Sequence, residues 1–288
     1  MYAAKRGNLG VAAYDATLGR QGTEQLSLLS ELRRAIENEE LRLVFQPKIH
    51  LSTGEVTGAE ALVRWQHPER GLMPPGDFIP FAEQTGFIKS ITRWVIEASA
   101  QQCARWSALG MSLQLVINIS VQDLLDPGIP EAILAALERN NVTTRSLGLE
   151  ITESGMMRDQ AAAIVVLKRF RALGIDVAID DFGTGHSSLA YVKQLEVTEL
   201  KIDRSFVRNL VQDGKDRAIV LSIIDLAHNL DLTVVAEGVE DKNSLEVLHK
   251  LGCDLVQGYV FAKPLAEREF RDWFSAWKPA AAREAITA

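Results

Sequence analysis

Short runs rich in Val, Ile and Leu recur along the chain, and each is followed by a stretch with helical periodicity. A run of four to eight apolar residues bounded by turn residues is typical of a buried strand. Eight runs are predicted as strands, at 41–46, 56–65, 113–119, 147–152, 176–180, 198–202, 232–237 and 253–258. Several intervening helices end alike, in Ala-Leu-Gly at 108–110 and 172–174 and in Lys-Leu-Gly at 250–252. We expect each glycine to adopt the left-handed conformation that stops a helix before the next strand.

This order of strand, helix, glycine and strand is the pattern of parallel βα units. Eight such units predict an α/β fold, a TIM-type (β/α)8 barrel. The 288 residues have room for one barrel of roughly 250 residues, and two smaller domains are the alternative. The connection at 49–56 is too short for a crossover helix and contains Ser-Thr-Gly, so we expect the first strand to run antiparallel.

The segment before the first strand has its own periodicity. Leu28, Leu32 and Ile36 stand at helical spacing within residues 27–40, which predicts an amphipathic helix leading into the barrel. Such a helix can cap the barrel base or link to an upstream domain.

Composition limits the partners and the compartment. The net charge is -7 and no cluster of Lys and Arg is visible, so we expect no nucleic-acid polymer as a partner. No run approaches the roughly 18 apolar residues of a membrane span, and the N-terminus lacks the layout of a signal peptide. Cys103 and Cys253 fit no paired metal spacing. We read them as reduced core thiols and expect a cytoplasmic domain.

Polar side chains stand at or near the carboxyl ends of most predicted strands. They are Glu60, Arg64, Asn118, Glu150, Asp180, Asp181, Lys201, Asp203, Glu237 and Gln257. Any one of them could simply form a turn or cap the next helix. In a parallel barrel, however, the carboxyl ends of the strands meet at one rim, where catalytic residues gather. We therefore expect the whole set to lie together.

Such a rim would hold far more negative than positive charge. Six carboxylates (Glu60, Glu150, Asp180, Asp181, Asp203 and Glu237) would face Lys201 alone, and like charges that close cannot all stay ionised without compensation. Divalent cations would supply the compensation. Carboxylates with one amide carbonyl suit Mg²⁺ or Mn²⁺, whereas zinc would call for His or Cys. The sequence therefore predicts a site for two Mg²⁺ or Mn²⁺ ions.

The motifs that carry these residues closely resemble the EAL-domain family over about residues 30–278. The matching segments are Glu60-Ala61-Leu62, Val63-Arg64-Trp65, Asn118-Ile119-Ser120, Glu150-Ile151-Thr152-Glu153, Asp180-Asp181-Phe182-Gly183-Thr184-Gly185, Lys201-Ile202-Asp203, Glu237-Gly238-Val239-Glu240 and Gln257-Gly258-Tyr259 with Pro264. The resemblance implies a barrel with an antiparallel first strand. It also implies a metal-dependent phosphodiesterase that hydrolyses cyclic di-GMP to linear pGpG by in-line attack of water at two metal ions.

The same resemblance assigns roles to individual residues. It implies that one metal is held by Glu60, Asn118, Glu150 and Asp180. Asp180 would bridge to a second metal held by Asp181, with Glu237 binding directly or through water. Lys201 would hold and polarise the attacking water, and Glu153 would brace the loop at 181–188. The residues implied to contact guanine, ribose or phosphate are Gln46, Leu62, Arg64, Asp203, Gln257 and Pro264.

Two positions depart from the family pattern, and the ends of the chain extend beyond the barrel. His186 stands where the family usually has Tyr, and Glu196 stands where it often has Pro. Residues 1–22 resemble the C-terminal end of a GGDEF diguanylate cyclase domain, and a flexible tail is a compatible alternative. Residues 23–278 are assigned to the EAL barrel and 279–288 to a disordered tail.

The family likeness also predicts context and leaves two alternatives open. It implies a homodimer through the barrel surface near 181–188, and a longer protein with GGDEF and sensory domains that could be anchored in a membrane. One alternative is a regulatory module that binds cyclic di-GMP with little or no turnover. The other is an unrelated metal barrel in which Lys201 forms a Schiff base.

Overall fold

The computed structural model describes residues 28–157, 159–185 and 189–280. The predicted GGDEF remnant at 1–22, His186 and residues 281–288 of the predicted tail lie outside the described residues. A helix over residues 28–37 leads into the barrel, as the periodicity predicts. On it Leu32 is fully buried, and Leu28 and Ile36 pack against the core.

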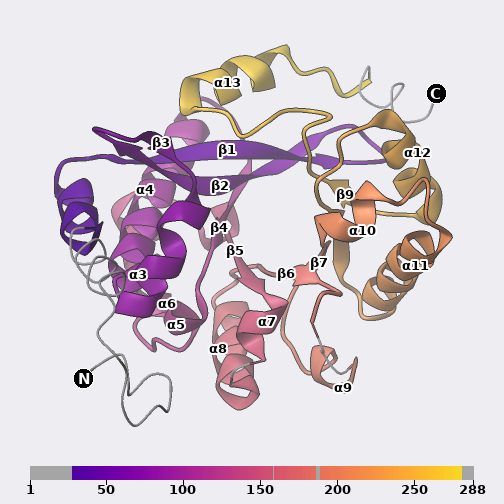
Figure 1. Ribbon diagram of the computed structural model, residues 1–288, viewed down its shortest axis with the longest axis horizontal. Coiled ribbons are helices and arrows are strands. Elements are labelled where there is room, and N and C mark those ends of the chain that lie inside the picture. The colour runs from indigo at the N-terminus through magenta and orange to yellow at the C-terminus, as the bar shows by residue number, and fades with distance from the viewer. Residues whose placement is uncertain (1–27, 158, 186–188, 281–288) are drawn as a thin grey trace, which may run out of the picture.

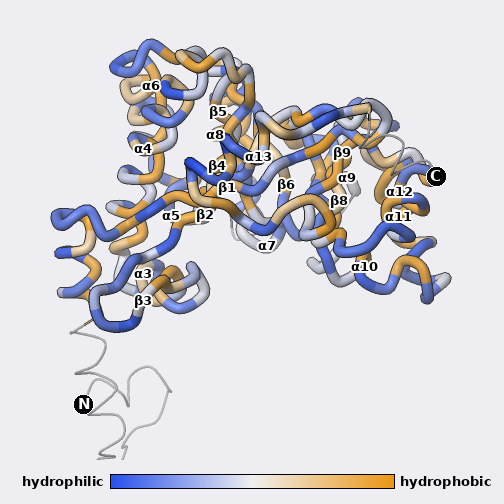
Figure 2. Tube along the Cα trace, turned by 90° about the horizontal axis from the view of Figure 1, so that it is seen from above, coloured by the Kyte–Doolittle hydropathy of each residue, from blue (hydrophilic) through white to orange (hydrophobic). Residues whose placement is uncertain are grey.

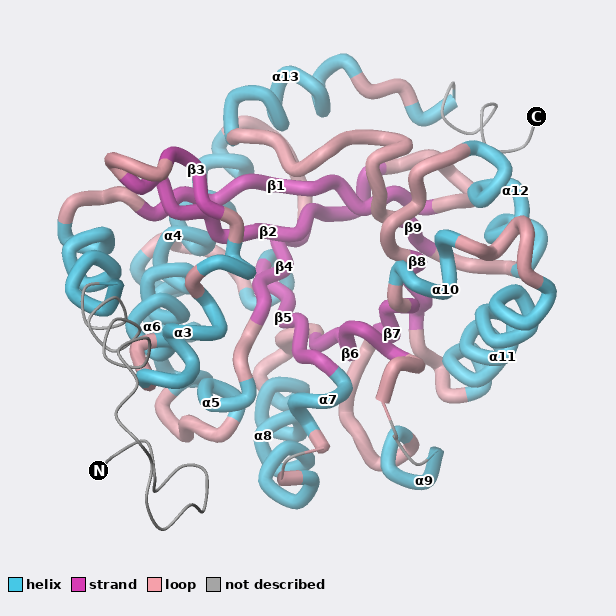
Figure 3. The backbone as a smooth tube through the Cα atoms, in the orientation of Figure 1, coloured by secondary structure: helices cyan, strands magenta, loops and turns pink. Residues whose placement is uncertain are grey.

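Eight strands form a closed ring, which is seen end-on in Figure 3. They are β1 (Leu41–His50), β2 (Val56–His67), β4 (Gln114–Asn118), β5 (Leu147–Thr152), β6 (Val177–Phe182), β7 (Glu199–Ile202), β8 (Thr233–Ala236) and β9 (Leu255–Val256). The hydrogen-bonded order runs β1-β9-β8-β7-β6-β5-β4-β2, and pairing of β1 with β2 closes the ring. The predicted barrel is confirmed, and it uses every predicted strand.

The first strand runs against its neighbours, as predicted. β1 pairs antiparallel with both β2 and β9, whereas the other neighbours around the ring pair in parallel. One strand was not predicted, β3 (Gly71–Met73), which pairs antiparallel with the end of β2. Three residues are too few to show a strand periodicity.

The helices surround the ring (Figure 1). They are η1 (Pro75–Asp77), α3 (Ile79–Thr85), α4 (Ile88–Ala108), α5 (Val121–Leu124), α6 (Ile129–Arg139), η2 (Thr144–Ser146), α7 (Glu153–Met156), α8 (Gln160–Ala172), α9 (Leu189–Val192), α10 (Arg204–Arg208), α11 (Gly214–Asn229), α12 (Lys242–Leu251) and α13 (Glu267–Ala276). Within the described residues, none is both long enough and apolar enough to span a bilayer. Several connections hold two helices, a short one at the rim and a longer one along the barrel wall.

The strands bury both of their faces. On β7, Leu200 and Ile202 pack outward against the helices, while Glu199 and Lys201 alternate with them and face the barrel interior. Figure 2 shows apolar segments along β8 and β9, with polar segments on the outer turns. The apolar core therefore lies mainly between the ring and the helices, and the inside of the ring can hold charged groups.

The C-terminal helix completes the shell around β1, which has no crossover helix of its own. Phe270 of α13 is fully buried and stacks on Trp106 of α4, with ring centroids 4.9 Å apart. Phe45 of β1 meets Trp106 edge-on at 5.0 Å. Figure 1 shows α13 lying across β1. This aromatic cluster joins the last element of the chain to the first strand.

The predicted glycine stops are confirmed. Gly110, Gly174 and Gly252 follow α4, α8 and α12 with φ of 75°, 71° and 82°. Gly252 is a clean test of this role, because a Cβ built there would meet nothing within 4 Å. Any cost of adding a side chain at Gly252 is therefore backbone strain alone.

We predict that Gly252→Ala lowers the free energy of unfolding by roughly 1–2 kcal/mol, the cost of a left-handed non-glycine residue. Gly214→Ala is the matched control, since a Cβ at Gly214 also meets nothing within 4 Å and its φ is not in the left-handed region. Urea denaturation of both variants checks the prediction. Equal stability of the two would contradict the helix-stop role.

Candidate active site

Lys201 lies at the centre of the barrel rim among carboxylates from β2, β5, β6 and the residue after β8. Its Nζ lies 2.5 Å from Glu237 Oε1 and 2.7 Å from Glu150 Oε2. Asp180 Oδ1 is 3.3 Å away and Glu60 Oε2 is 3.9 Å away. Lys201 is completely buried, so these contacts lie where the dielectric is low and opposite charges attract strongly. The prediction that these four carboxylates and Lys201 come together is confirmed.

The register of the strands explains why these side chains meet. Asn118 of β4 is level with Glu150 of β5, and Thr152 of β5 is level with Asp180 of β6. On the antiparallel side, Gln46 of β1 pairs with Glu60 of β2. Each pairing brings residues from separate motifs to the same height in the barrel.

Glu60 is held by amide groups on both oxygens. Asn118 donates from Nδ2 to Oε1 at 2.7 Å, and Gln257 donates from Nε2 to Oε2 at 2.5 Å. Gln257 also donates to Gln46 Oε1 at 3.1 Å. Burial by itself would raise the pKa of Glu60, but Lys201 and the two amide donors lower it overall. Glu60 is therefore ionised, and both of its oxygens are held in place.

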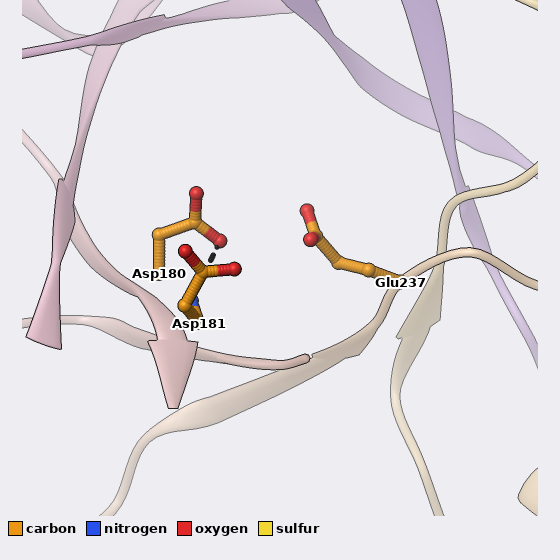
Figure 4. A group of neighbouring side chains, drawn as sticks. All are labelled: Asp180, Asp181 and Glu237. Atoms are coloured by element: carbon orange, nitrogen blue, oxygen red, sulfur yellow. Dashed lines mark hydrogen bonds between the residues drawn. The ribbon is translucent and has the colours of Figure 1, made fainter. Parts of the chain in front are cut away.

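Asp180, Asp181 and Glu237 form a second group of oxygens beside Lys201. One carboxylate oxygen from each lies within 4.8 Å of the others, and Figure 4 shows the three side chains facing one another. Asp181 has a left-handed backbone, with φ of 54°. Its N–H donates to Asp180 Oδ1 at 2.9 Å. Aspartate is one of the few non-glycine residues that adopt this conformation readily.

Burial and the crowding of charged groups shift the pKa values of the rim residues. Burial raises the pKa of Glu150 well above its usual value, although Lys201 opposes the shift. Burial also raises the pKa of Glu237 to about 7. Burial and the neighbouring Asp180 raise the pKa of Asp181 to about 6. Burial would lower the pKa of Lys201, but the surrounding carboxylates raise it well above its usual value, so Lys201 stays an ammonium ion.

The oxygen groups around Lys201 fit divalent cations. Lys201 Nζ lies 2.7 Å from Glu150, but this contact is not aligned as a hydrogen bond, and both Glu150 oxygens are buried without a hydrogen-bond partner among the described residues. Burial, Asp180 and Asp203 all raise the pKa of Asp181, and a cation beside these carboxyl groups would offset their repulsion. Oxygen ligands without His or Cys suit Mg²⁺ or Mn²⁺.

Glu153 binds the backbone of the loop that follows β6. Its Oε2 accepts hydrogen bonds from the N–H groups of Gly183 at 2.9 Å and Gly185 at 3.2 Å. A Cβ at Gly185 would lie 2.6 Å from Glu153 Oε1. Gly183 in turn faces Phe206 and Ile223, since a Cβ there would lie 3.0 Å and 3.2 Å from their side chains. The loop therefore connects Glu153 to α10 and α11.

A cleft of about 310 Å³ opens beside the acidic group. The residues that line it and that were predicted for the site are Gln46, Glu60, Leu62, Asp180, Glu237 and Gln257. Arg204, Arg208 and Tyr259 also line it and were not predicted for the site. Each of them follows a strand, as the predicted site residues do. A single polar residue after a strand, however, is a weak signal of a functional role.

Three predicted contact residues are not among those that line the cleft. Arg64 is half-buried, and burial lowers its pKa while Glu60 and Tyr259 oppose the shift. Asp203 caps α10 by accepting from the Ser205 N–H at 2.9 Å, which is the helix-cap role weighed as an alternative for strand-end residues. Pro264 precedes Leu265, which pairs with Phe45.

One buried ion pair was missed entirely. Lys48 Nζ lies 2.6 Å from Glu199 Oε1, and Lys48 is only 4% exposed. The signal was present in the sequence, because Lys48 stands two residues after Gln46 and Glu199 two residues before Lys201. Residues two apart on a strand share a face.

Comparison with known proteins agrees with this site. The EAL-domain family model matches residues 29–264. The chain is 41% identical over 267 residues to the bifunctional diguanylate cyclase/cyclic di-GMP phosphodiesterase MucR of Pseudomonas aeruginosa, covering 92% of this chain and 39% of MucR. It is 39% identical over 275 residues to the cyclic di-GMP phosphodiesterase PdeR of Escherichia coli, covering 95% of this chain and 42% of PdeR. The chain thus spans less than half of these curated relatives.

Solved structures share the fold. A MucR phosphodiesterase structure in complex with c-di-GMP superposes with a TM-score of 0.81 at 41% identity, covering 85% of this chain and 99% of that one. The EAL enzyme Bd1971, in a form with cAMP and cyclic di-GMP bound, gives a TM-score of 0.83 at 34% identity, covering 90% and 72%. The family motifs, the barrel with its reversed first strand and these likenesses agree, and the chain belongs to the EAL-domain family.

Proposed function

We propose that this chain is a phosphodiesterase that hydrolyses cyclic di-GMP to linear pGpG with two Mg²⁺ or Mn²⁺ ions. The observation that carries the proposal is the rim itself, where the buried Lys201 ammonium lies among four carboxylates. The family relatives that are named as cyclic di-GMP phosphodiesterases support the choice of substrate.

The chain would hold the ions at two groups of oxygens. Glu60, Asn118, Glu150 and Asp180 would form one site, and Asp180 with Asp181 and Glu237 would form the other. Bound there, two divalent ions would supply water activation and charge neutralisation for an in-line displacement at phosphorus. The amide shell of Glu60 would keep its carboxylate oriented, because Asn118 and Gln257 hold one oxygen each.

Lys201 would orient the attacking water. The surrounding carboxylates raise its pKa despite burial, so it donates hydrogen bonds and does not act as a base. The same charge argues against the Schiff-base alternative, which requires a neutral amine. Among the predicted contact residues, Gln46, Leu62 and Gln257 line the cleft, and Arg64, Asp203 and Pro264 would extend the substrate surface beside it.

The alternative role is a regulatory module that binds cyclic di-GMP without cutting it. Loss of a metal ligand would favour that role, and every predicted ligand position is filled. Measured turnover separates the two roles, since both predict binding.

We also propose the domain context and the oligomeric state of the chain. Upstream GGDEF and sensory domains would belong to the full-length protein, which would keep this domain in the cytoplasm. A homodimer would form near the loop at 181–188, where Gly183 packs against α11. Ile219 and Leu221 of α11 are 38% and 40% exposed, which gives this side of the barrel apolar groups for self-association.

The first prediction of the proposed function concerns the metal. Purified chain incubated with cyclic di-GMP should form pGpG with Mg²⁺ or Mn²⁺, and Ca²⁺ should suppress the reaction, because calcium prefers longer bonds and higher coordination numbers. Chromatography of the products measures both effects. Equal turnover with Ca²⁺ would contradict the two-metal proposal, and binding without any product would favour the regulatory module.

The second prediction concerns Lys201. Lys201→Ala should lower kcat by orders of magnitude, while cyclic di-GMP still binds in the presence of Ca²⁺. Lys201→Met, which keeps the volume, should behave alike, and Lys250→Ala on the surface of α12 should leave kcat unchanged. Kinetics and calorimetric titration check this. A collapse of affinity with near-normal residual turnover would show that Lys201 binds substrate instead.

The third prediction concerns the loop brace. Glu153→Ala removes the acceptor for the Gly183 and Gly185 N–H groups and should weaken Mn²⁺ binding and turnover together by about tenfold or more. Glu246→Ala, which changes a partly exposed glutamate of α12, is the control. Metal titration, turnover and dimer mass are measured on the same samples. Unchanged turnover and metal dependence would remove the brace role.

A further inference from the structure

The buried pair of Lys48 and Glu199 crosses the inside of the barrel. β1 and β7 are not neighbours, because β9 and β8 lie between them. Even so, Lys48 Nζ reaches Glu199 Oε1 at 2.6 Å, with the two side chains 5% and 14% exposed. The pair therefore spans the barrel interior rather than lying along its wall.

The pair lies in the layer directly beneath the acidic rim. Gly58, Gly148 and Ala178 stand two residues before Glu60, Glu150 and Asp180, and so face the same interior. Gly58 is paired with Lys48, and Ala178 with Glu199. Branched apolar residues usually fill this part of a barrel. Here Gln114 and Val116 pack beside Gly58 and Gly148, and the two opposite charges share the layer with them.

Glu199 competes with the rim for Lys201. The two residues are two apart on β7 and share its inner face. An unpaired buried carboxylate at Glu199 would attract the Lys201 ammonium strongly. Lys201 instead contacts Glu150 and Glu237 at 2.7 Å and 2.5 Å, and Lys48 is the partner that neutralises Glu199.

We propose that Lys48 is a positioning residue for the hydrolysis: by binding Glu199 it keeps that carboxylate from drawing Lys201 down out of the acidic rim. Lys48 also acts from below by charge, since it repels Lys201 and attracts Glu150. Burial alone would lower the pKa of Lys48, but Glu199 and Glu150 raise it, so Lys48 stays an ammonium ion. The inference rests on the proposed phosphodiesterase function.

The test is a double-mutant cycle measured with cyclic di-GMP and Mn²⁺. Lys48→Met should lower kcat by about tenfold or more with KM within about twofold, because it releases Glu199 without touching the substrate surface. Adding Glu199→Gln removes the competing carboxylate, so the double variant Lys48→Met/Glu199→Gln should recover kcat to within about threefold of the unmodified chain. Recovery would show that the unpaired Glu199 carboxylate, and not the loss of the Lys48 charge itself, lowers kcat.

Crystal structures of the single and double variants provide a readout that does not depend on activity. In Lys48→Met the Lys201 Nζ should lie within hydrogen-bond distance of Glu199, and in the double variant it should return to Glu150 and Glu237. Phe270→Leu, a core change on α13, should lower the melting temperature without lowering kcat at the assay temperature. This control variant distinguishes a loss of stability from a displacement of Lys201.

The outcomes are distinct. An unmodified chain that forms no pGpG would refute the proposed function, and the Lys201 position in the variants would still decide the inference. If the unmodified chain is active, then a normal kcat in Lys48→Met, a double variant no faster than Lys48→Met, or an unmoved Lys201 would each overturn the positioning role.

Discussion

The structure depends on placing one ammonium ion inside a ring of carboxylates. Taking a charge out of water is unfavourable unless opposite charges surround it, and Lys201 meets this condition through Glu60, Glu150, Asp180 and Glu237. Those carboxylates repel one another, so each needs Lys201, an amide donor or a metal ion. These contacts form only if the eight strands keep their register.

This charged interior determines where the apolar core can be. Alternation puts one face of every strand toward the axis, and near the rim that face is polar. Stability must then come from the outer face, where Leu200, Ile202 and their counterparts pack against helices. β1 lacks a crossover helix, and α13 covers it through Phe270. The last helix is therefore as necessary to the barrel as any βα unit.

The expectations that failed did so for identifiable physical reasons. β3 has three residues, and β9 has two where six were predicted, because short strands owe their pairing to neighbours more than to periodicity. Asp203 caps α10 through Ser205, and its predicted contact with substrate stays a prediction. The pair of Lys48 and Glu199 was not predicted. Alternation places each residue on the inner face of its strand, but nothing local indicates that β1 and β7 face each other across the ring.

The sequence by itself determined the eight strands, the helix stops at Gly110, Gly174 and Gly252, the reversal of the first strand and the residues of the acidic rim. These follow from periodicity, turn chemistry and motif identity, which are local properties of the chain. Only the tertiary structure decided that Gln257 and Asn118 share the two oxygens of Glu60 and that Lys48 reaches Glu199. Alternation tells which face of a strand a side chain occupies, but the distance across the barrel depends on closure of the whole ring.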